Sequence, residues 1–122
     1  MEETVARRVV LVVDDEPDIR YLLRTALEAA GYEVVEAAHG EAALEMMEQA
    51  LPHVVVTDWM MPRMDGGELI DQLRADTMTR SIPIVIVSST NREPGRADAV
   101  LGKPFDPGEL ILVVDRLTGK ER

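Results

Sequence analysis

The sequence predicts an α/β fold built around a parallel sheet. Short blocks of consecutive apolar residues alternate with stretches in which apolar residues recur every three or four positions, and this alternation is typical of repeated strand–helix–strand units. The first block, Val9–Val13, is apolar throughout, as expected for a parallel strand that is covered on both faces. We expect a single domain over residues 1–122, with its core at about 8–117 and frayed ends.

Near Pro17, the run of consecutive apolar residues typical of the first strand gives way to the spacing of three and four residues typical of a helix. Residues Arg8–Val13 form the predicted strand. Pro17 suits the first position of a helix, and Gly31 is a usual residue just after a helix end. Between them, the apolar positions at helical spacing are Ile19, Leu22, Leu23, Ala26, Leu27 and Ala30.

The next strand, helix and strand repeat this pattern. Tyr32–Glu36 and His53–Thr57 are the predicted strands, and the helix between them begins near Gly40 and is stopped by Pro52. The predicted inner face of that helix comprises Ala43, Leu44, Met47 and Leu51. A loop over Met60–Gly67 then leads into a third helix, whose buried stripe comprises Leu69, Ile70 and Leu73.

The last two strands are predicted at Ile82–Val87 and Ala99–Leu101, and a final helix runs from its cap at Asp106 to about Leu117. Only residues 88–98 lie between these two strands. That length is tight for a full crossover helix and its loops. We therefore expect a shortened or missing fourth helix.

Composition narrows the function classes. A formal charge of −10 repels nucleic acid backbones and anionic membranes, so we expect no direct binding of nucleic acid and no membrane insertion. Cysteine is absent, which excludes disulfides and thiolate zinc sites. The apolar block near the start of the chain runs directly into Asp14 and does not resemble a leader segment. We expect a soluble, cytoplasmic protein.

The chemistry-bearing residues follow the predicted strands, at the point where each strand ends. Asp14 and Asp15 follow the first, Asp58 the third, Ser88 the fourth and Lys103 the fifth. In an open parallel sheet the ligand site lies beyond the carboxyl ends of the strands. Carboxylates repel one another, so several in one crevice favour a hard cation such as Mg²⁺. With a hydroxyl and an ammonium nearby, the set is complete for phosphoryl transfer to a carboxylate.

Four sequence segments extend this interpretation: VVDDEPD at 12–18, TDWMMPRMDG at 57–66, PIVIVSS at 83–89 and KPF at 103–105. Over nearly the whole chain, their order and strand-end positions resemble the receiver domain of bacterial two-component response regulators, the CheY-like domain. The resemblance implies a flavodoxin-like, doubly wound sheet of strand order 2-1-3-4-5. It also implies a regulator that accepts a phosphoryl group from a sensor histidine kinase or a phosphotransfer protein and then changes its partner binding. Such a domain is no enzyme toward outside substrates and catalyses only its own phosphorylation and dephosphorylation.

Each site residue acquires an expected role from this resemblance. Asp58 resembles the phosphoacceptor and Lys103 the lysine that pairs with the phosphoryl group. Ser88 resembles the hydroxyl that switches on phosphorylation. The implied Mg²⁺ ligands are Asp14, Asp15, Asp58 and the backbone carbonyl of Met60. The resemblance also implies a cis peptide between Lys103 and Pro104.

The chain also departs from the family pattern. The segment from Ser88 to Lys103 is several residues shorter than usual, and the deletion falls on the usual output face. Val100 and Leu101 occupy the stretch where receivers tend to have a switching Tyr or Phe. Ser89 replaces the common Ala or Gly, which implies an altered phosphate lifetime.

Alternative interpretations exist for these residues. Asp14 and Asp15 also suit the cap of the first helix. A flavin-binding flavodoxin is disfavoured because its phosphate-binding loop is rich in Ser, Thr and Gly, and the loop here is acidic. A haloacid-dehalogenase-type phosphatase needs a second Asp two residues after Asp58, where Met60 stands. The main alternative is a receiver fold that acts as a protein-interaction module without phosphorylation.

Overall fold

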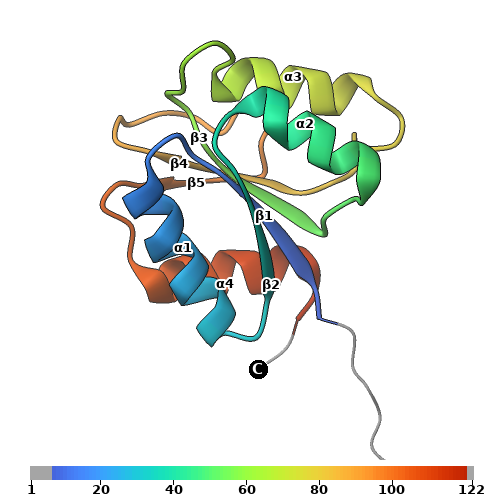
Figure 1. The fold of residues 1–122 in the computed structure, drawn as a ribbon. Coiled ribbons are helices and arrows are strands. Elements are labelled where there is room, and N and C mark those ends of the chain that lie inside the picture. The colour runs from blue at the N-terminus through green and yellow to red at the C-terminus, as the bar shows by residue number, and fades with distance from the viewer. Residues whose placement is uncertain (1–6, 121–122) are drawn as a thin grey trace, which may run out of the picture.

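The computed structural model describes residues 7–120 and shows a five-stranded sheet with helices on both faces (Figure 1). The strand order is β2-β1-β3-β4-β5, and all neighbouring strands are parallel. This confirms the predicted topology. The elements are β1 (Val9–Val13), α1 (Pro17–Ala29), β2 (Glu33–Ala37), α2 (Gly40–Gln49), β3 (Val54–Asp58), α3 (Gly66–Ala75), β4 (Ile84–Ser88), β5 (Ala99–Gly102) and α4 (Pro107–Thr118).

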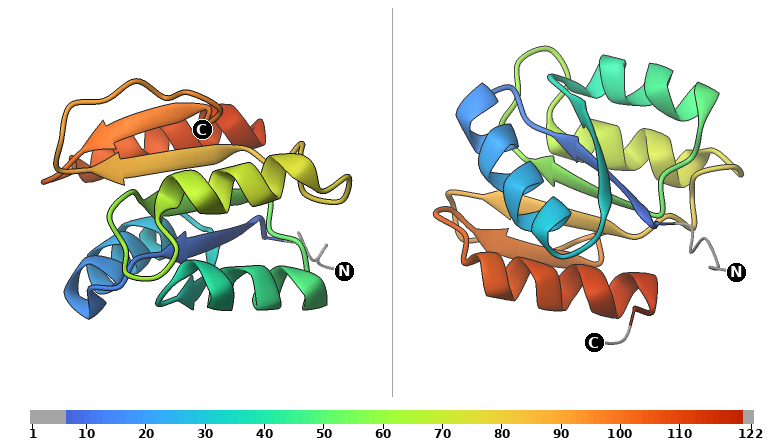
Figure 2. Two further views of the ribbon diagram at one scale, coloured as in Figure 1. Left: turned by 90° about the horizontal axis from the view of Figure 1, so that it is seen from above. Right: turned by 60° about the horizontal axis from the view of Figure 1, so that its bottom comes forward.

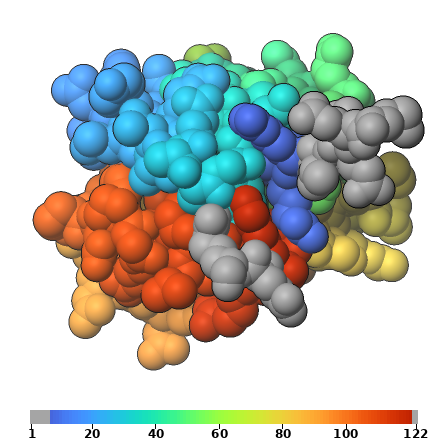
Figure 3. All heavy atoms as spheres, turned by 90° about the horizontal axis from the view of Figure 1, so that it is seen from below, coloured from blue at the N-terminus to red at the C-terminus, as the bar shows by residue number. Residues whose placement is uncertain are grey.

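Alternate side chains of β1 face two separate core layers. Val10 and Val12 belong to the layer formed with α1 and α4, whereas Leu11 and Val13 belong to the layer formed with α2 and α3. All four side chains are buried, as expected for a strand that is apolar throughout. Figure 3 shows the face of the molecule on which α1 and α4 lie side by side.

The end of α1 explains how the chain turns sharply into β2. Gly31 adopts a left-handed conformation with φ of 96°. Its N–H donates to the carbonyl of Glu28, and the Tyr32 N–H donates to the carbonyl of Leu27. This pair of hydrogen bonds is the Schellman motif, which satisfies the last carbonyls of a helix and favours glycine at this position.

Several strands begin one or two residues later than the hydrophobic pattern predicts. Tyr32 is engaged in the end of α1, so β2 starts only after it. Before β4, the Ile82 N–H donates to the carbonyl of Thr79 in a turn, and Pro83 has no N–H to contribute to the sheet. Local turn hydrogen bonds therefore decide where these strands begin.

Two apolar residues placed on inner helix faces are in fact exposed. Leu22 of α1 is 51% exposed, because the apolar positions of that helix span a wider arc than the face that meets the sheet. Leu51 is 43% exposed, because α2 ends at Gln49 and the chain has already left the helix. The sequence prediction was wrong for both residues.

The chain end differs from the predicted frayed tail as far as the structure describes it. Helix α4 continues to Thr118, whose hydroxyl donates to the Val114 carbonyl at 2.8 Å. Lys120 Nζ then donates to the carbonyl of Ala30 at 2.9 Å, which ties this end of the chain to the end of α1. The predicted fraying of residues 1–6 lies outside the described residues.

No helix forms between β4 and β5. The connection over 89–98 arches between the two strands as loop and turns (Figure 2, left), so the expected fourth helix is missing. Arg74 of α3 anchors this connection: its guanidinium donates to the Arg96 carbonyl at 3.0 Å and to the Asp98 carboxylate at 3.0 Å. Of the helices within residues 7–120, none is sufficiently long and apolar to cross a membrane.

Candidate functional site

The predicted strand-end residues meet at one edge of the sheet. Register places Asp58 beside Val87 of β4, and Ser88 beside Gly102 of β5, the residue before Lys103. Four carboxylates gather there, with oxygens that all lie within 4.8 Å of one another: those of Asp14, Asp15, Glu16 and Asp58. Asp14 and Asp58 are buried, whereas Asp15 and Glu16 are exposed. The site is therefore closed toward the sheet and open toward solvent.

Lys103 is the cation of this cluster. Its Nζ lies 3.1 Å from Asp14 Oδ2, 3.3 Å from Asp58 Oδ1 and 3.8 Å from Glu16 Oε1. The side chain is only 14% exposed. The peptide bond between Lys103 and Pro104 is cis, as predicted. The structure thus brings an ammonium into direct contact with two buried carboxylates that come from different strands.

Asp14 is held on every side by its neighbours. Its backbone N–H donates to the Ala37 carbonyl at 3.2 Å, which extends the pairing of β1 with β2. Oδ1 accepts the Glu16 N–H at 2.9 Å, and Oδ2 accepts Lys103 Nζ. The residue that caps α1 is Glu16, and it makes no side-chain cap hydrogen bond. The alternative role of Asp14 and Asp15 as helix caps is therefore not seen.

Asp58 lies in an environment that disfavours its charge. Burial and the charge of Asp14 raise the pKa of the Asp58 carboxyl, although Lys103 and the Met60 N–H act in the opposite direction. Oδ1 accepts the Met60 N–H at 3.4 Å. This contact places the Met60 backbone beside the carboxylate, while the Met60 side chain is 67% exposed. Any contribution of Met60 to the site therefore comes from its backbone.

Lys103 shows the opposite balance. Burial by itself lowers the pKa of its ammonium, but the hydrogen bond and charge of Asp14, together with those of Asp58, raise the pKa above its ordinary value. Lys103 therefore remains charged at neutral pH. The two shifts have different leading causes: burial comes first for Asp58, whereas the neighbouring carboxylates raise the pKa of Lys103 in spite of burial.

Ser88 ends β4 in a buried position, and its hydroxyl is engaged locally. Its Oγ lies 3.1 Å from the Thr90 hydroxyl and accepts the Thr90 N–H at 3.2 Å. The Ser88 carbonyl accepts the Lys103 N–H at 2.9 Å, which couples the ends of β4 and β5. Ser89 is exposed. The hydrogen bonds of the Ser88 hydroxyl within the described part of the chain go to Thr90 and not to Asp58.

The donor set fits a hard divalent cation. All four clustered side chains are carboxylates, and oxygen donors of this kind are what Mg²⁺ prefers. Neither thiolate nor imidazole belongs to the cluster found among residues 7–120.

Comparison with known proteins decides the family. The family model for the response regulator receiver domain matches residues 10–115. The chain belongs to this family. Two solved structures share the flavodoxin-like fold of this receiver domain over most of its length. A putative response regulator from Chloroflexus aurantiacus has a TM-score of 0.89 at 30% identity, covering 93% of this chain and 99% of that one. Chemotaxis protein CheY4 of Vibrio cholerae has a TM-score of 0.86 at 32% identity, covering 92% and 99%.

Relatives by sequence fall into two length classes. An uncharacterized 14.6 kDa protein in the sodA1 3′ region of Leptolyngbya boryana is 40% identical over 121 residues, which cover 93% of this chain and 92% of that protein. The phosphate regulon transcriptional regulatory protein PhoB of Pseudomonas aeruginosa is 36% identical over 111 residues, which cover 85% of this chain and 48% of PhoB. The receiver domain thus spans about half the length of PhoB.

Sequence reasoning missed several residues that contact the site. Glu16 joins the carboxylate cluster, and its place two residues after Asp14 in an acidic loop was the available signal. Thr90 binds the Ser88 hydroxyl, and Arg20 binds the Asp14 backbone. Arg92 stacks over the Trp59 ring, with Cζ 3.4 Å from the ring centroid. These last contacts depend on loop and rotamer geometry that residue spacing does not encode.

Proposed function

We propose that this receiver domain accepts a phosphoryl group on Asp58 from a phosphohistidine of a sensor kinase or phosphotransfer protein, with Mg²⁺, and that phosphorylation changes its partner binding. The observation that carries the proposal is the contact of Lys103 with both Asp14 and Asp58, inside a cluster of four carboxylates. A purely structural strand end has no need of so much buried charge, because buried charge is costly.

The proposed transfer forms a bond between a carboxylate oxygen of Asp58 and phosphorus. The P–N bond of the donor breaks, and its imidazole leaves with the electron pair. The contacts of the Asp58 side chain within residues 7–120 fall on Oδ1, so we assign Oδ2 as the nucleophile. Lys103 would then pair with a phosphoryl oxygen, since its Nζ already lies beside this carboxylate.

The metal site assigned in this proposal uses residues of two strand ends. Asp14, Asp15, Asp58 and the carbonyl of Met60 are the groups that we expect to hold Mg²⁺. When bound, Mg²⁺ supplies positive charge that offsets the charge of the carboxylates and of the incoming phosphoryl group. Glu16 lies in the same cluster, and its exposure makes it a candidate for the hydration shell of the ion.

Ser88 is the proposed link between phosphorylation and the surface. A phosphoryl oxygen on Asp58 would compete with Thr90 for the Ser88 hydroxyl. Turning Ser88 toward Asp58 breaks its contacts with the Thr90 hydroxyl and N–H, which fix the first residues of the 89–98 connection. Phosphorylation would thereby shift the population of conformations of this connection and of whatever binds it.

An apolar groove beside Lys103 suits a protein donor. It is lined by Ile19 and Leu22 of α1 and by residues 104, 105 and 107 after β5. The exposed Leu22 belongs to this groove. A partner that packs there would hold its phosphohistidine near Asp58. We also propose a cytoplasmic location, no direct nucleic acid binding and no membrane insertion, in keeping with the charge of −10.

The second candidate, an interaction module that works without phosphorylation, draws on the missing helix between β4 and β5. Trp59 fluorescence distinguishes the two, because Trp59 directly follows Asp58. For a phosphoacceptor, we expect emission to change on addition of Mg²⁺ and to change again with beryllium fluoride, a phosphoryl mimic. The second change should be absent in Asp58→Asn. If the Trp59 emission of the wild type does not change with beryllium fluoride in saturating Mg²⁺, the interaction module without phosphorylation would be favoured.

A further inference from the structure

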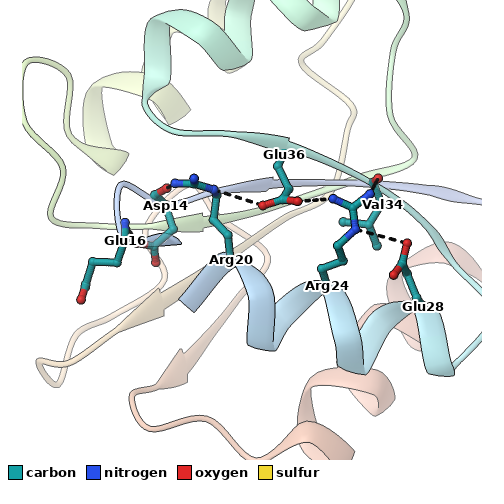
Figure 4. Close-up of polar contacts among 7 residues, drawn as sticks. All are labelled: Asp14, Glu16, Arg20, Arg24, Glu28, Val34 and Glu36. Atoms are coloured by element: carbon teal, nitrogen blue, oxygen red, sulfur yellow. Dashed lines mark hydrogen bonds and ion pairs between the residues drawn. The ribbon is translucent and has the colours of Figure 1, made fainter. Parts of the chain in front are cut away.

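A chain of ion pairs leads from the carboxylate cluster along α1 (Figure 4). Arg20 donates through one terminal nitrogen to the Asp14 carbonyl at 2.7 Å, and through Nε to Glu36 at 3.1 Å. Arg24, one turn further along the helix, also pairs with Glu36 and donates to the Val34 carbonyl at 3.2 Å. The Arg20 side chain is 18% exposed, so the pair is largely shielded from solvent.

The Asp14 carbonyl is the group through which Arg20 acts on the site. The carbonyl of Asp14 and the N–H of Asp15 belong to one planar peptide unit. A hydrogen bond that fixes the carbonyl therefore also fixes the direction in which the chain leaves toward Asp15. The Asp14 carboxylate is already held by Lys103 and by the Glu16 N–H. Asp15 has no such anchor of its own in the described residues and depends on its peptide plane.

Glu36 in turn orients Arg20. Its two oxygens accept from different arginines, Oε1 from Arg20 and Oε2 from Arg24. Arg24 is itself fixed by Val34 and by Glu28 at 3.3 Å. The Arg20 guanidinium is thus set in place before any ligand arrives, and little side-chain entropy is lost when it acts.

We propose that Arg20 is a positioning residue of the Mg²⁺ site: it orients the Asp14–Asp15 peptide so that both carboxylates point at one ion. This inference rests on the proposed function, because it concerns the same metal site. The Arg20 guanidinium adds a positive charge beside the carboxylate cluster, and this charge also reduces the repulsion among the carboxylates. Residues that orient metal ligands typically contribute about 10-fold to 100-fold in affinity.

The chain offers a matched control. Arg20→Ala and Arg24→Ala remove the same charge from the same helix and the same partner, Glu36, but only Arg20 touches Asp14. Titration with Mg²⁺, followed by Trp59 fluorescence, should show affinity about tenfold weaker in Arg20→Ala and changed less than about threefold in Arg24→Ala. Arg20→Lys keeps the charge and one donor, so it should recover part of the loss, and it serves if Arg20→Ala does not fold.

A second measurement needs no metal. Amide hydrogen exchange in chelator-treated protein should be faster at Asp14 and Glu16, whose N–H groups are hydrogen-bonded, in the Arg20 variants than in wild type. The increase should be much smaller in Arg24→Ala, which leaves the hydrogen bond of Arg20 to Asp14 in place. Equal Mg²⁺ affinities for the Arg20 and Arg24 variants, or equal exchange at Asp14 and Glu16, would overturn the positioning role. A wild-type protein with no Mg²⁺ response would instead overturn the proposed metal site itself, with the exchange comparison still deciding what Arg20 orients.

Discussion

At the scale of single residues, the site is an unbalanced set of charges. Lys103 is shared by Asp14 and Asp58, and Glu16 adds a further carboxylate at its edge. One ammonium therefore faces more negative charge than it offsets. Burial first, and then the charge of Asp14, raise the pKa of Asp58. Removing the charge of Asp58 should therefore stabilise the fold, whereas removing the charge of Lys103 should destabilise it.

Neutralising Asp58 should stabilise the metal-free fold. Because burial and Asp14 disfavour the ionised form of Asp58, we expect Asp58→Asn to unfold at higher urea concentration than wild type in chelator-treated buffer at pH 7. The folded-state pKa lies above the unfolded one, so the wild type gains stability as pH falls through that window and loses it as pH rises. The advantage of the variant should therefore shrink on acidification.

Urea unfolding at several pH values in the neutral-to-acid range measures this directly. Asp98→Asn is a useful control, since Asp98 forms an ion pair with Arg74 outside the cluster. Removing the charge of Asp98 should lower stability, where removing that of Asp58 should raise it. An Asp58→Asn protein that is less stable than wild type at neutral pH without metal would contradict the charge balance described here.

Removing the ammonium should have the opposite effect. Lys103→Met leaves the carboxylates of Asp14 and Asp58 facing each other without a cation. We expect the free energy of unfolding to fall by about 2 kcal/mol in metal-free buffer. This is less than the cost of about 3–5 kcal/mol for breaking a fully buried pair, because the site opens to solvent at Glu16. Mg²⁺ should recover part of this loss. Unfolding curves with and without Mg²⁺ test it, and a variant as stable as wild type without metal would argue against Lys103 as the balancing charge.

At the scale of elements, the connection between β4 and β5 departs from the alternation of strands and helices in the rest of the sheet. It has no helix, yet it is tied down at both ends. Arg92 stacks on Trp59 near its start, and Arg74 binds Asp98 at its end. Asp98 also accepts the Ile84 N–H at 2.8 Å, so this anchor reaches the first residue of β4.

Arg74 should be a major stabilising residue of this region. Its side chain is 13% exposed, and its guanidinium donates to four groups: the carbonyls of Arg80, Ile82 and Arg96, and the Asp98 carboxylate. We expect Arg74→Ala to lower the free energy of unfolding by about 2–3 kcal/mol, because four hydrogen bonds are lost together and the partly buried Ile82 carbonyl loses its donor. Urea unfolding measures the loss.

Arg80→Ala provides the comparison for Arg74→Ala. Arg80 is exposed and contributes only its carbonyl to this network. Its substitution should change stability by about 0.5 kcal/mol or less. Similar losses for the two variants would mean that the connection is not anchored through Arg74.

The elements also show what the sequence could predict. Short blocks rich in apolar residues located every strand, and the short spacing between the last two strands correctly predicted that a helix would be reduced or missing there. Strand starts were less predictable, because turn hydrogen bonds such as Ile82 to Thr79 compete with the sheet. Leu22 was misplaced because helical spacing gives a face but not its width.

For the site, residue spacing brought together the strand-end aspartates and Lys103 but missed their supporting contacts. Arg20 has no sequence signal, since its effect depends on reaching a backbone carbonyl across a turn. Thr90 likewise depends on a local loop conformation. The ligand roles of Asp14, Asp15, Asp58 and Met60 remain predictions, as do the phosphoryl-transfer roles of Asp58, Ser88 and Lys103.

At the scale of the whole molecule, the proposed chemistry and the proposed partner binding share one edge of the sheet. The carboxylate cluster, the groove beside Lys103 and the start of the 89–98 connection all lie beyond the carboxyl ends of the strands. A donor protein in the groove and a target at the connection would therefore approach neighbouring surfaces. This arrangement makes it possible to separate docking from chemistry by mutation.

A charge in the groove should impair transfer from a protein donor only. The donor is a phosphorylated sensor kinase that transfers its phosphoryl group to the wild type. We expect Leu22→Arg to slow this transfer about tenfold, which corresponds to a loss of about 1.4 kcal/mol in the free energy of docking. Labelling by a small phosphodonor should be unchanged. Met78→Arg, which alters another exposed apolar residue at the opposite end of the sheet, should affect neither rate. Equal slowing with both donors would place the defect in the site and not in docking.

The measurement that tests the central claim most directly is the intact mass of the protein after incubation with a small phosphodonor and Mg²⁺. We predict the addition of one phosphoryl group to the wild type, its loss when Mg²⁺ is chelated, and none in Asp58→Asn. An unchanged wild-type mass beside a reactive control receiver, or labelling that persists in Asp58→Asn, would contradict the account.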